Sequence, residues 1–206
     1  GTIAHGLGVV PKMIIVKAIS GAPGGAQAWS VYNEAIGATN ILMLNTTAAK
    51  SDQADFNDTA ATSSLFSLGT ANRTNASGGP YIAYVFADVP GYSKFGAWTG
   101  NGTANNGAFV YTGFKPAYLL VKSADGITEW FITDDKRPGY NANYRINPNI
   151  MDAEATAASA NYCDLLSNGF KVRYTDVAGE EQIYMAFAEN PFVTSTDNNS
   201  IPTTAR

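Results

Sequence analysis

Charge, cysteine and histidine are all scarce in this chain of 206 residues. Lys and Arg number 13 against 17 Asp and Glu, a net charge of -4, and no basic run is present. We therefore expect no nucleic-acid partner, because phosphates need clustered basic side chains. Cys163 is the only cysteine, so no disulfide can form within the chain, and we expect it to be a buried small hydrophobe rather than a reactive thiol.

Long apolar runs are absent too. The longest, such as KMIIVK and YLLVK, are far shorter than the roughly 20 residues of a membrane-spanning helix, so we expect no membrane insertion. Gly, Ser, Thr, Asn and Ala are abundant and aromatic residues reach 12%. This composition is typical of an all-β protein with many turns. The start at Gly1-Thr2 and the polar tail TSTDNNSIPTTAR suggest a module of a longer protein.

One phrase occurs twice. HGLGVVPKMIIVK near the start matches YTGFKPAYLLVK, with Gly8 and Gly113, Pro11 and Pro116, and Lys17 and Lys122 each separated by 105 positions. Three later landmarks follow in the same order in both halves: AWSVY and EWFIT, LFSLG and GFKVR, and YIAYVFADVP and QIYMAFAENP. The sequence therefore predicts an internal duplication of about 100 residues.

Each copy has the pattern of an antiparallel sandwich. Pro11 and Pro116 cannot donate to a ladder and should mark strand starts, and the apolar runs that follow them are short enough for buried strands. We expect an all-β fold of two tandem, pseudo-symmetric, antiparallel β-sandwich-like repeats packed as one unit. The first repeat spans residues 1–92, and the second spans 93–206 with an inter-repeat strand in KFGAWTG and a C-terminal tail. At most one short helix is expected, around 151–166, where the sequence is rich in Ala.

The residues give little support for an enzyme. His5 is the only histidine, and at the 105-residue spacing its counterpart is Val110, so a catalytic triad is not expected. The acidic neighbours Asp134-Asp135 and Glu180-Glu181 should point to opposite faces of a strand and are interpreted as solvated charges. No cofactor is expected. Asp52, Asp55 and Asp58 are weak calcium candidates, and ordinary turn residues are the favoured interpretation.

Aromatic residues offer a binding role. Tyr92 and Trp98 lie near the inter-repeat link, and Arg137 and Tyr140 flank the Pro138-Gly139 turn. Rings with one polar edge can stack on a sugar or a protein surface while keeping a hydrogen bond. We therefore take Tyr92, Trp98, Arg137 and Tyr140 as candidate ligand-binding residues, although Trp98 in its predicted strand is equally suited to the core.

Five phrases carry a family resemblance: AHGLGVVPKMIIVK, YSKFGAWTGNG, FVYTGFKPAYLLVK, DLLSNGFKVR and IYMAFAENPF. Together they resemble a duplicated domain of phage tail fibre and other virion structural proteins, many from marine phages. The resemblance covers nearly the whole chain and implies a non-enzymatic, all-β virion module. It brings no known catalytic or binding residues.

Three functions follow as expectations. The first is a tail- or fibre-associated virion module involved in host-surface attachment, localised in the virion, forming a homo-oligomer and contacting other virion proteins and a host-surface glycan or protein. The second is a capsid decoration or fibre-shaft domain. The third is a carbohydrate-binding module of a secreted protein.

Overall fold

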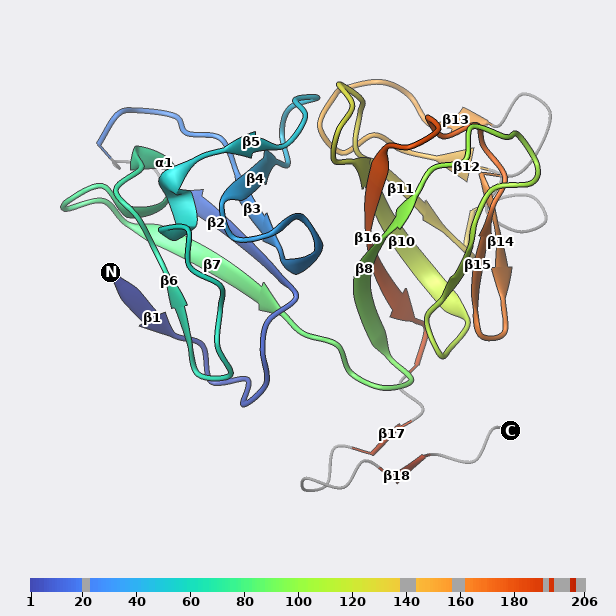
Figure 1. The fold of residues 1–206 in the computed structure, drawn as a ribbon, viewed down its shortest axis with the longest axis horizontal. Helices are drawn as coiled ribbons and strands as arrows, with labels where there is room; N and C mark the ends of the chain where they lie inside the picture. Colours follow the sequence, from blue (N-terminus) through green and yellow to red (C-terminus); the bar gives the residue numbers. More distant parts are fainter. Residues whose placement is uncertain (20–22, 138–143, 157–161, 191–192, 195–200, 203–206) are drawn as a thin grey trace. The chain divides into compact units, whose positions relative to one another are not determined.

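The computed structural model describes the chain except residues 20–22, 138–143, 157–161, 191–192, 195–200 and 203–206 (Figure 1). It divides into two compact units: unit 1 is Gly1–Ala87 with Ser123–Glu129, and unit 2 is Asp88–Lys122 with Trp130–Arg206. The expected all-β class is confirmed, since antiparallel strands make up most of the regular structure. In the described part of the chain, no helix has the length and hydrophobicity to cross a membrane.

Unit 1 is built on a five-stranded sheet in the order β5-β4-β3-β2-β7 and a two-stranded sheet of β1 and β6. Its strands are β1 (Thr2–Ala4), β2 (Met13–Ala18), β3 (Ser30–Asn33), β4 (Asn40–Met43), β5 (Ser51–Asp52), β6 (Leu65–Ser67) and β7 (Tyr81–Phe86). Three short helices are η1 (Glu34–Ile36), η2 (Ala54–Phe56) and α1 (Asn72–Asn75). Side chains of both sheets, among them Ile14, Val16 and Phe66, form its core.

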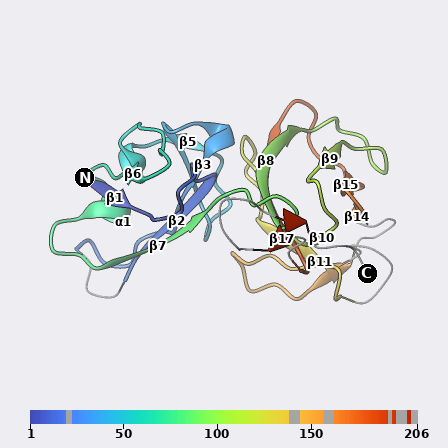
Figure 2. The same cartoon turned by 90° about the horizontal axis from the view of Figure 1, so that it is seen from below.

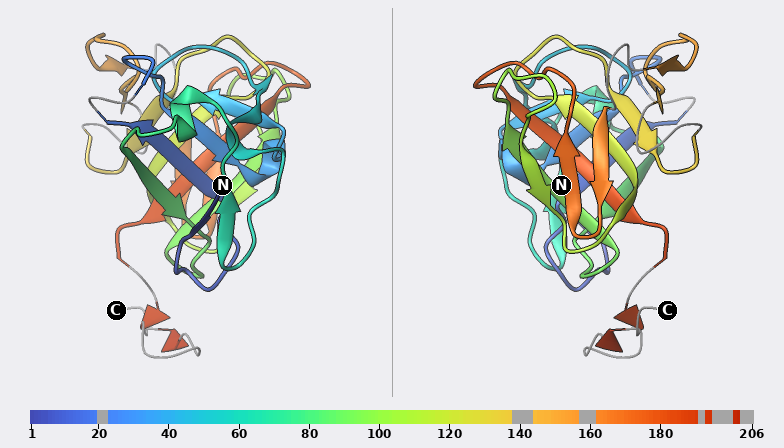
Figure 3. Two further views of the ribbon diagram at one scale, coloured as in Figure 1. Left: turned by 90° about the vertical axis from the view of Figure 1, so that its left-hand side faces the viewer. Right: turned by 90° about the vertical axis from the view of Figure 1, so that its right-hand side faces the viewer.

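Unit 2 pairs a four-stranded sheet in the order β11-β10-β16-β8 with a three-stranded sheet in the order β14-β15-β9. The strands are β8 (Ser93–Thr99), β9 (Phe109–Tyr111), β10 (Pro116–Ser123), β11 (Phe131–Asp134), β12 (Tyr144–Arg145), β13 (Ala155–Thr156), β14 (Cys163–Leu166), β15 (Gly169–Val172), β16 (Glu181–Ala188), β17 (Val193–Thr194) and β18 (Ile201–Pro202). Figure 2 shows β15 beside β9 and β14, and the right view of Figure 3 looks onto β14 and β15 in orange. Leu119 and Tyr184 from the larger sheet meet Phe170 from the smaller one in the core.

The described part of 151–166 does not contain the expected helix. Ala155–Thr156 is a strand that pairs with β12, and Cys163–Leu166 is a strand that forms a hairpin with β15, while 157–161 lie outside the described residues. Cys163 and Leu165 are buried and alternate with Asp164 and Leu166, so this stretch has strand periodicity. The only α-helix of the described residues is α1, elsewhere in the chain.

The two units have corresponding strand neighbours. β2 lies between β3 and β7 in unit 1, and β10 lies between β11 and β16 in unit 2. Three backbone hydrogen bonds of unit 1 also have counterparts in unit 2. In unit 1 they are Glu34 N–H to Lys12 O, His5 N–H to Ser64 O, and Leu68 N–H to Gly1 O. The counterparts in unit 2 are, in the same order, Asp135 N–H to Ala117 O, Thr112 N–H to Asn168 O, and Val172 N–H to Ala108 O. The duplication stays a prediction, but these bonds make equivalent positions of the two units comparable.

This pairing corrects one expected correspondence. Ile3 pairs with Phe66 and Val110 pairs with Phe170, so Val110 is the counterpart of Ile3. The counterpart of His5 is Thr112, whose N–H makes the matching backbone bond. The 105-residue spacing fails here because Gly8 follows Ile3 by five positions, whereas Gly113 follows Val110 by three.

Candidate functional site

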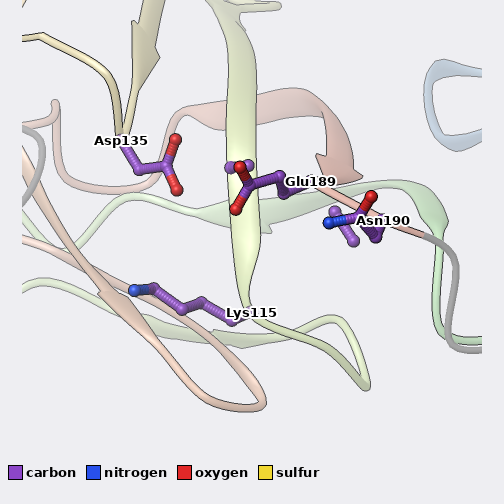
Figure 4. A pocket seen from close by; sticks show the side chains of 6 residues that line it. Lys115, Asp135, Glu189 and Asn190 are labelled. Carbon is purple, nitrogen blue, oxygen red and sulfur yellow. The ribbon is translucent and has the colours of Figure 1, made fainter. Parts of the chain in front are cut away.

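A small polar hollow lies at one end of unit 2. It has a volume of about 170 Å³ and is lined by Lys115, Ala117, Asp135, Ala188, Glu189 and Asn190 (Figure 4). Because β10 and β11 are antiparallel, the start of β10 with Lys115 and Ala117 meets the end of β11 with Asp135. Ala188 ends β16 and carries Glu189 and Asn190 to the same place. Three strand ends therefore fix the charged side chains around the hollow.

Asp135 contributes a largely buried carboxylate group to the lining of the hollow. Its side chain is 20% exposed, and its Oδ1 atom is buried and receives no hydrogen bond from the described residues. The ammonium group of Lys136 lies 3.6 Å from this oxygen, close enough for attraction but too far for a good hydrogen bond. Because this oxygen has no exposed surface, the charge of Lys136 rather than a ligand offsets the cost of its burial.

Glu189 is held as a carboxylate. Lys136 Nζ lies 2.6 Å from Glu189 Oε1, and this hydrogen bond lowers the pKa of the Glu189 carboxyl group and raises the pKa of the Lys136 ammonium group. A general acid of a glycosidase needs a raised carboxyl pKa. Glu189 is therefore suited to accept hydrogen bonds from a ligand rather than to protonate a leaving group.

Ala117 lines the hollow with a short side chain. In unit 1 the equivalent position is Lys12, whose Nζ atom lies 2.5 Å from Glu34 Oε2, and Glu34 is the equivalent of Asp135. The backbone bond that joins the two positions is 3.0 Å long in both units. Unit 1 thus fills this place with a lysine that pairs with the acid, whereas unit 2 leaves space beside the acid.

Tyr92, a predicted contact residue, bonds to a residue that lines this site. Its carbonyl oxygen accepts a 2.8 Å hydrogen bond from Ala188 N–H, and its ring packs against Phe187 with centroids 5.7 Å apart. Tyr92 is half-buried, so one side of the ring is held and the rest is accessible. Tyr118 packs on Phe187 as well, at 6.2 Å, and burial raises the pKa of its phenol group.

Trp98 belongs to the core. It is 8% exposed, its ring contacts Phe170 and Tyr184, and its indole N–H donates a 3.0 Å hydrogen bond to Asp176. A ligand cannot stack on a ring that is covered in this way, so the core interpretation of Trp98 holds and the contact interpretation loses its support.

Arg137 uses its guanidinium group within the protein. Its Nε atom lies 2.9 Å from Asp134 Oδ2, and its Nη1 atom donates to Glu154. It follows Asp135 by two residues and adds positive charge near the hollow without lining it. Tyr140 lies outside the described residues.

The calcium candidates do not come together. Asp55 is fully buried, and its carboxylate is neutralised by Arg73 and accepts a hydrogen bond from Ser30, while Asp52 and Asp58 are exposed. No cluster of three His, Cys, Asp or Glu side chains suited to a metal ion is found among the residues that the structure describes. Asp55, one of the three calcium candidates, is thus the buried counter-ion of Arg73.

His5 and Cys163 have structural environments. The Nε2 atom of His5 lies 3.0 Å from Thr62 O, and its Nδ1 atom accepts the Leu7 N–H at 3.2 Å, so backbone groups hold both ring nitrogens. Cys163 is a free, buried cysteine, and burial raises the pKa of its thiol group.

Sequence reasoning missed the residues of the hollow. Asp135 was interpreted as one of two solvated neighbours, because a strand sends adjacent side chains to opposite faces. The available signal was the repeat comparison itself, in which Lys12 of VPKM aligns with Ala117 of KPAY. A large side chain replaced by a small one beside a retained acid marks space for a ligand.

The model of a family described as "Domain of unknown function (DUF7483)" matches residues 1–191. No curated protein matches the chain, and no solved structure matches it.

Proposed function

We propose that this chain, which belongs to the DUF7483 family of unknown function, is a non-enzymatic structural module of a phage virion that binds a host-surface glycan or protein. The module is associated with the tail or its fibres and assembles with other virion proteins. Its five family-like phrases support the virion assignment, and the hollow of unit 2 supports the attachment role.

The observation that carries the recognition role is the replacement of Lys12 by Ala117 at equivalent positions. Ala117 lines a hollow of about 170 Å³ together with the Asp135 carboxylate, the charged Glu189 and the amide of Asn190. Such acceptors and donors suit the hydroxyl groups of a sugar or the polar side chains of a peptide. The hollow is smaller than the roughly 300–1,000 Å³ of typical ligand pockets, so it fits one small polar group of a larger surface ligand.

A contact of this size is weak by itself. Attachment therefore requires several copies of the module acting together, because linking sites raises avidity by roughly 10²-fold or more. The role thus predicts a homo-oligomer in the virion.

The test is binding of a multivalent display of the chain to intact bacteria and to a glycan array. Ala117→Lys is the informative variant, since unit 1 shows that a lysine fits beside an acid at this position. We expect at least a tenfold loss of binding, with an unchanged circular dichroism spectrum and melting temperature. Asp135→Asn, which keeps the shape and removes the charge, should also weaken binding.

The matched control is Lys12→Ala, which opens the equivalent place in unit 1 and should leave binding unchanged. Equal binding by folded Ala117→Lys and by the natural sequence would overturn the proposed site. Uniform signal across all cells and glycans would overturn recognition as a function.

A purely structural role, as a capsid decoration or fibre-shaft domain, is the second candidate. The uncharged outer strand β7 of unit 1 favours it, because such an edge can pair with a neighbouring chain. A carbohydrate-binding module of a secreted protein would use the same hollow and differs in localisation.

A further inference from the structure

Strand β7 ends its sheet with an open edge. It pairs with β2 on one side, and no strand of the described chain pairs with its other side. Its counterpart β16 in unit 2 lies between β10 and β8 (Figure 1). In the described part of unit 1, no strand takes the place that β8 has in unit 2.

The backbone groups of β7 that face this edge can be identified from the hydrogen bonding. Ile19 N–H donates to Pro80 O, and because antiparallel residues bond alternately, Ile82 and Tyr84 bond to β2. The N–H and C=O groups of Tyr81, Ala83 and Val85 consequently point to the open edge.

The equivalent groups of β16 are paired. Gly100 N–H donates to Glu180 O and Ala188 N–H donates to Tyr92 O, which places the alternating bonds to β8 at Gln182, Tyr184 and Ala186. These three residues are the counterparts of Tyr81, Ala83 and Val85 in the matching phrases. The same backbone positions are thus bonded in unit 2 and open in unit 1.

Exposure shows the same contrast. Ile82 and Tyr84 are 39% and 42% exposed, whereas their counterparts Ile183 and Met185 are 0% and 5% exposed. β7 also has no charged residue and no proline, the usual protections of an edge strand. Such an edge is a template for a further strand.

We propose that the β7 edge binds one extended polypeptide strand from outside residues 1–206, antiparallel to β7 as β8 is to β16. Only a polypeptide backbone offers donors and acceptors at the spacing of Tyr81, Ala83 and Val85. Apolar side chains of the strand lie opposite Ile82 and Tyr84, as Ala97 and Phe95 of β8 lie opposite Ile183 and Met185. The mode of binding is strand addition to a sheet edge.

The strand that binds β7 is expected to differ from β8 at the position that Gly96 occupies in β8. Gly96 of β8 lies opposite Tyr184, and a Cβ atom there would come within 3.1 Å of the Tyr184 ring. The counterpart of Tyr184 in β7 is Ala83, which has no ring. A residue larger than glycine therefore fits opposite Ala83, and a β-branched residue there favours the strand.

The experiment measures amide hydrogen exchange of the whole chain with a synthetic peptide of the sequence Tyr92–Gly102. We expect at least tenfold slower exchange at Tyr81, Ala83 and Val85 when the peptide is present. A Gly96→Val peptide should reach the same protection at a lower concentration. In the chain, Ala83→Pro should keep the fold, because its N–H does not bond to β2, and should abolish the peptide's effect.

Two proline peptides serve as matched controls that do not depend on folding of a variant. Gly96→Pro removes an N–H that faces β7 and should abolish protection, while Ala97→Pro removes one that faces away and should retain it. Any of three results would overturn the proposal. The two proline peptides could have equal effects, or the original peptide could give no protection at millimolar concentration. The third result is protection that appears without peptide and increases with protein concentration. The last result would mean that two copies of the chain pair instead.

Discussion

The guanidinium group of Arg73 donates two hydrogen bonds to the carboxylate of Asp55, from Nε at 3.0 Å and from Nη2 at 2.8 Å. Asp55 is fully buried and also accepts a hydrogen bond from Ser30. This ion pair links η2 to α1 in unit 1, because Asp55 belongs to η2 and Arg73 belongs to α1. Thr74 Oγ1 of α1 donates a further hydrogen bond to Asp55 O. The aspartate that sequence spacing offered as a calcium ligand is a structural anchor.

Arg73→Ala should therefore lower the free energy of unfolding by about 3 kcal/mol, because it leaves a buried carboxylate without its counter-ion. Urea denaturation measures this loss. The control is Lys50→Ala, which breaks the more exposed pair of Lys50 and Asp125 and should cost less than about 1 kcal/mol. Equal effects of the two variants, or a melting temperature that rises with calcium, would contradict this assignment.

Tyr184 makes stability depend on alkaline pH. Burial, with a smaller contribution from the charge of Asp88, raises the pKa of Tyr184 to about 12, above its ordinary value of 10.0. The neutral phenol is thus favoured by folding, so its contribution is complete below pH 10 and is lost as the pH rises from 10 towards 12. This residue alone lowers the free energy of unfolding by up to about 1.4 kcal/mol per pH unit in that range.

Urea unfolding between pH 9 and 11.5 tests this effect. Tyr184→Phe should show a shallower loss of stability with pH, by about one proton, while the other buried tyrosines contribute equally to both proteins. Identical slopes for the two proteins would show that Tyr184 ionises as freely in the folded state as in the unfolded state.

Cys163 should not react in the folded protein. It is 4% exposed, and burial raises the pKa of its thiol group, so both access and the thiolate form are suppressed. Alkylation at pH 8 should follow global unfolding, being slow in buffer and complete in denaturant. Labelling of the native chain at the rate of a free cysteine would contradict the buried position.

The sequence predicts the frame better than the site. Pro116 begins β10 and Pro11 shortly precedes β2, as expected of a residue that cannot donate to a ladder. The Ala-rich sequence predicts a helix around 151–166, but Ala155–Thr156 pairs with β12 instead. Helix propensity is weak, and tertiary pairing overrides it. The alternation of Cys163 and Leu165 was the correct signal for a strand.

The hollow was out of reach of single-position reasoning. Asp135 becomes a candidate only when Ala117 across the strand pair is seen to line the same hollow. That relationship depends on the register of β10 and β11, which composition does not encode. Trp98 illustrates the converse, since its predicted strand placed it correctly but could not tell the core face from the outer face.

We propose that this chain is an attachment module at the tail of a phage particle. Cryo-electron microscopy of purified particles labelled with an antibody fragment against unit 2 tests it most directly. We expect label at the tail or its fibres, with less label when soluble receptor is present. Label on the capsid alone, or a chain absent from the particle, would contradict it.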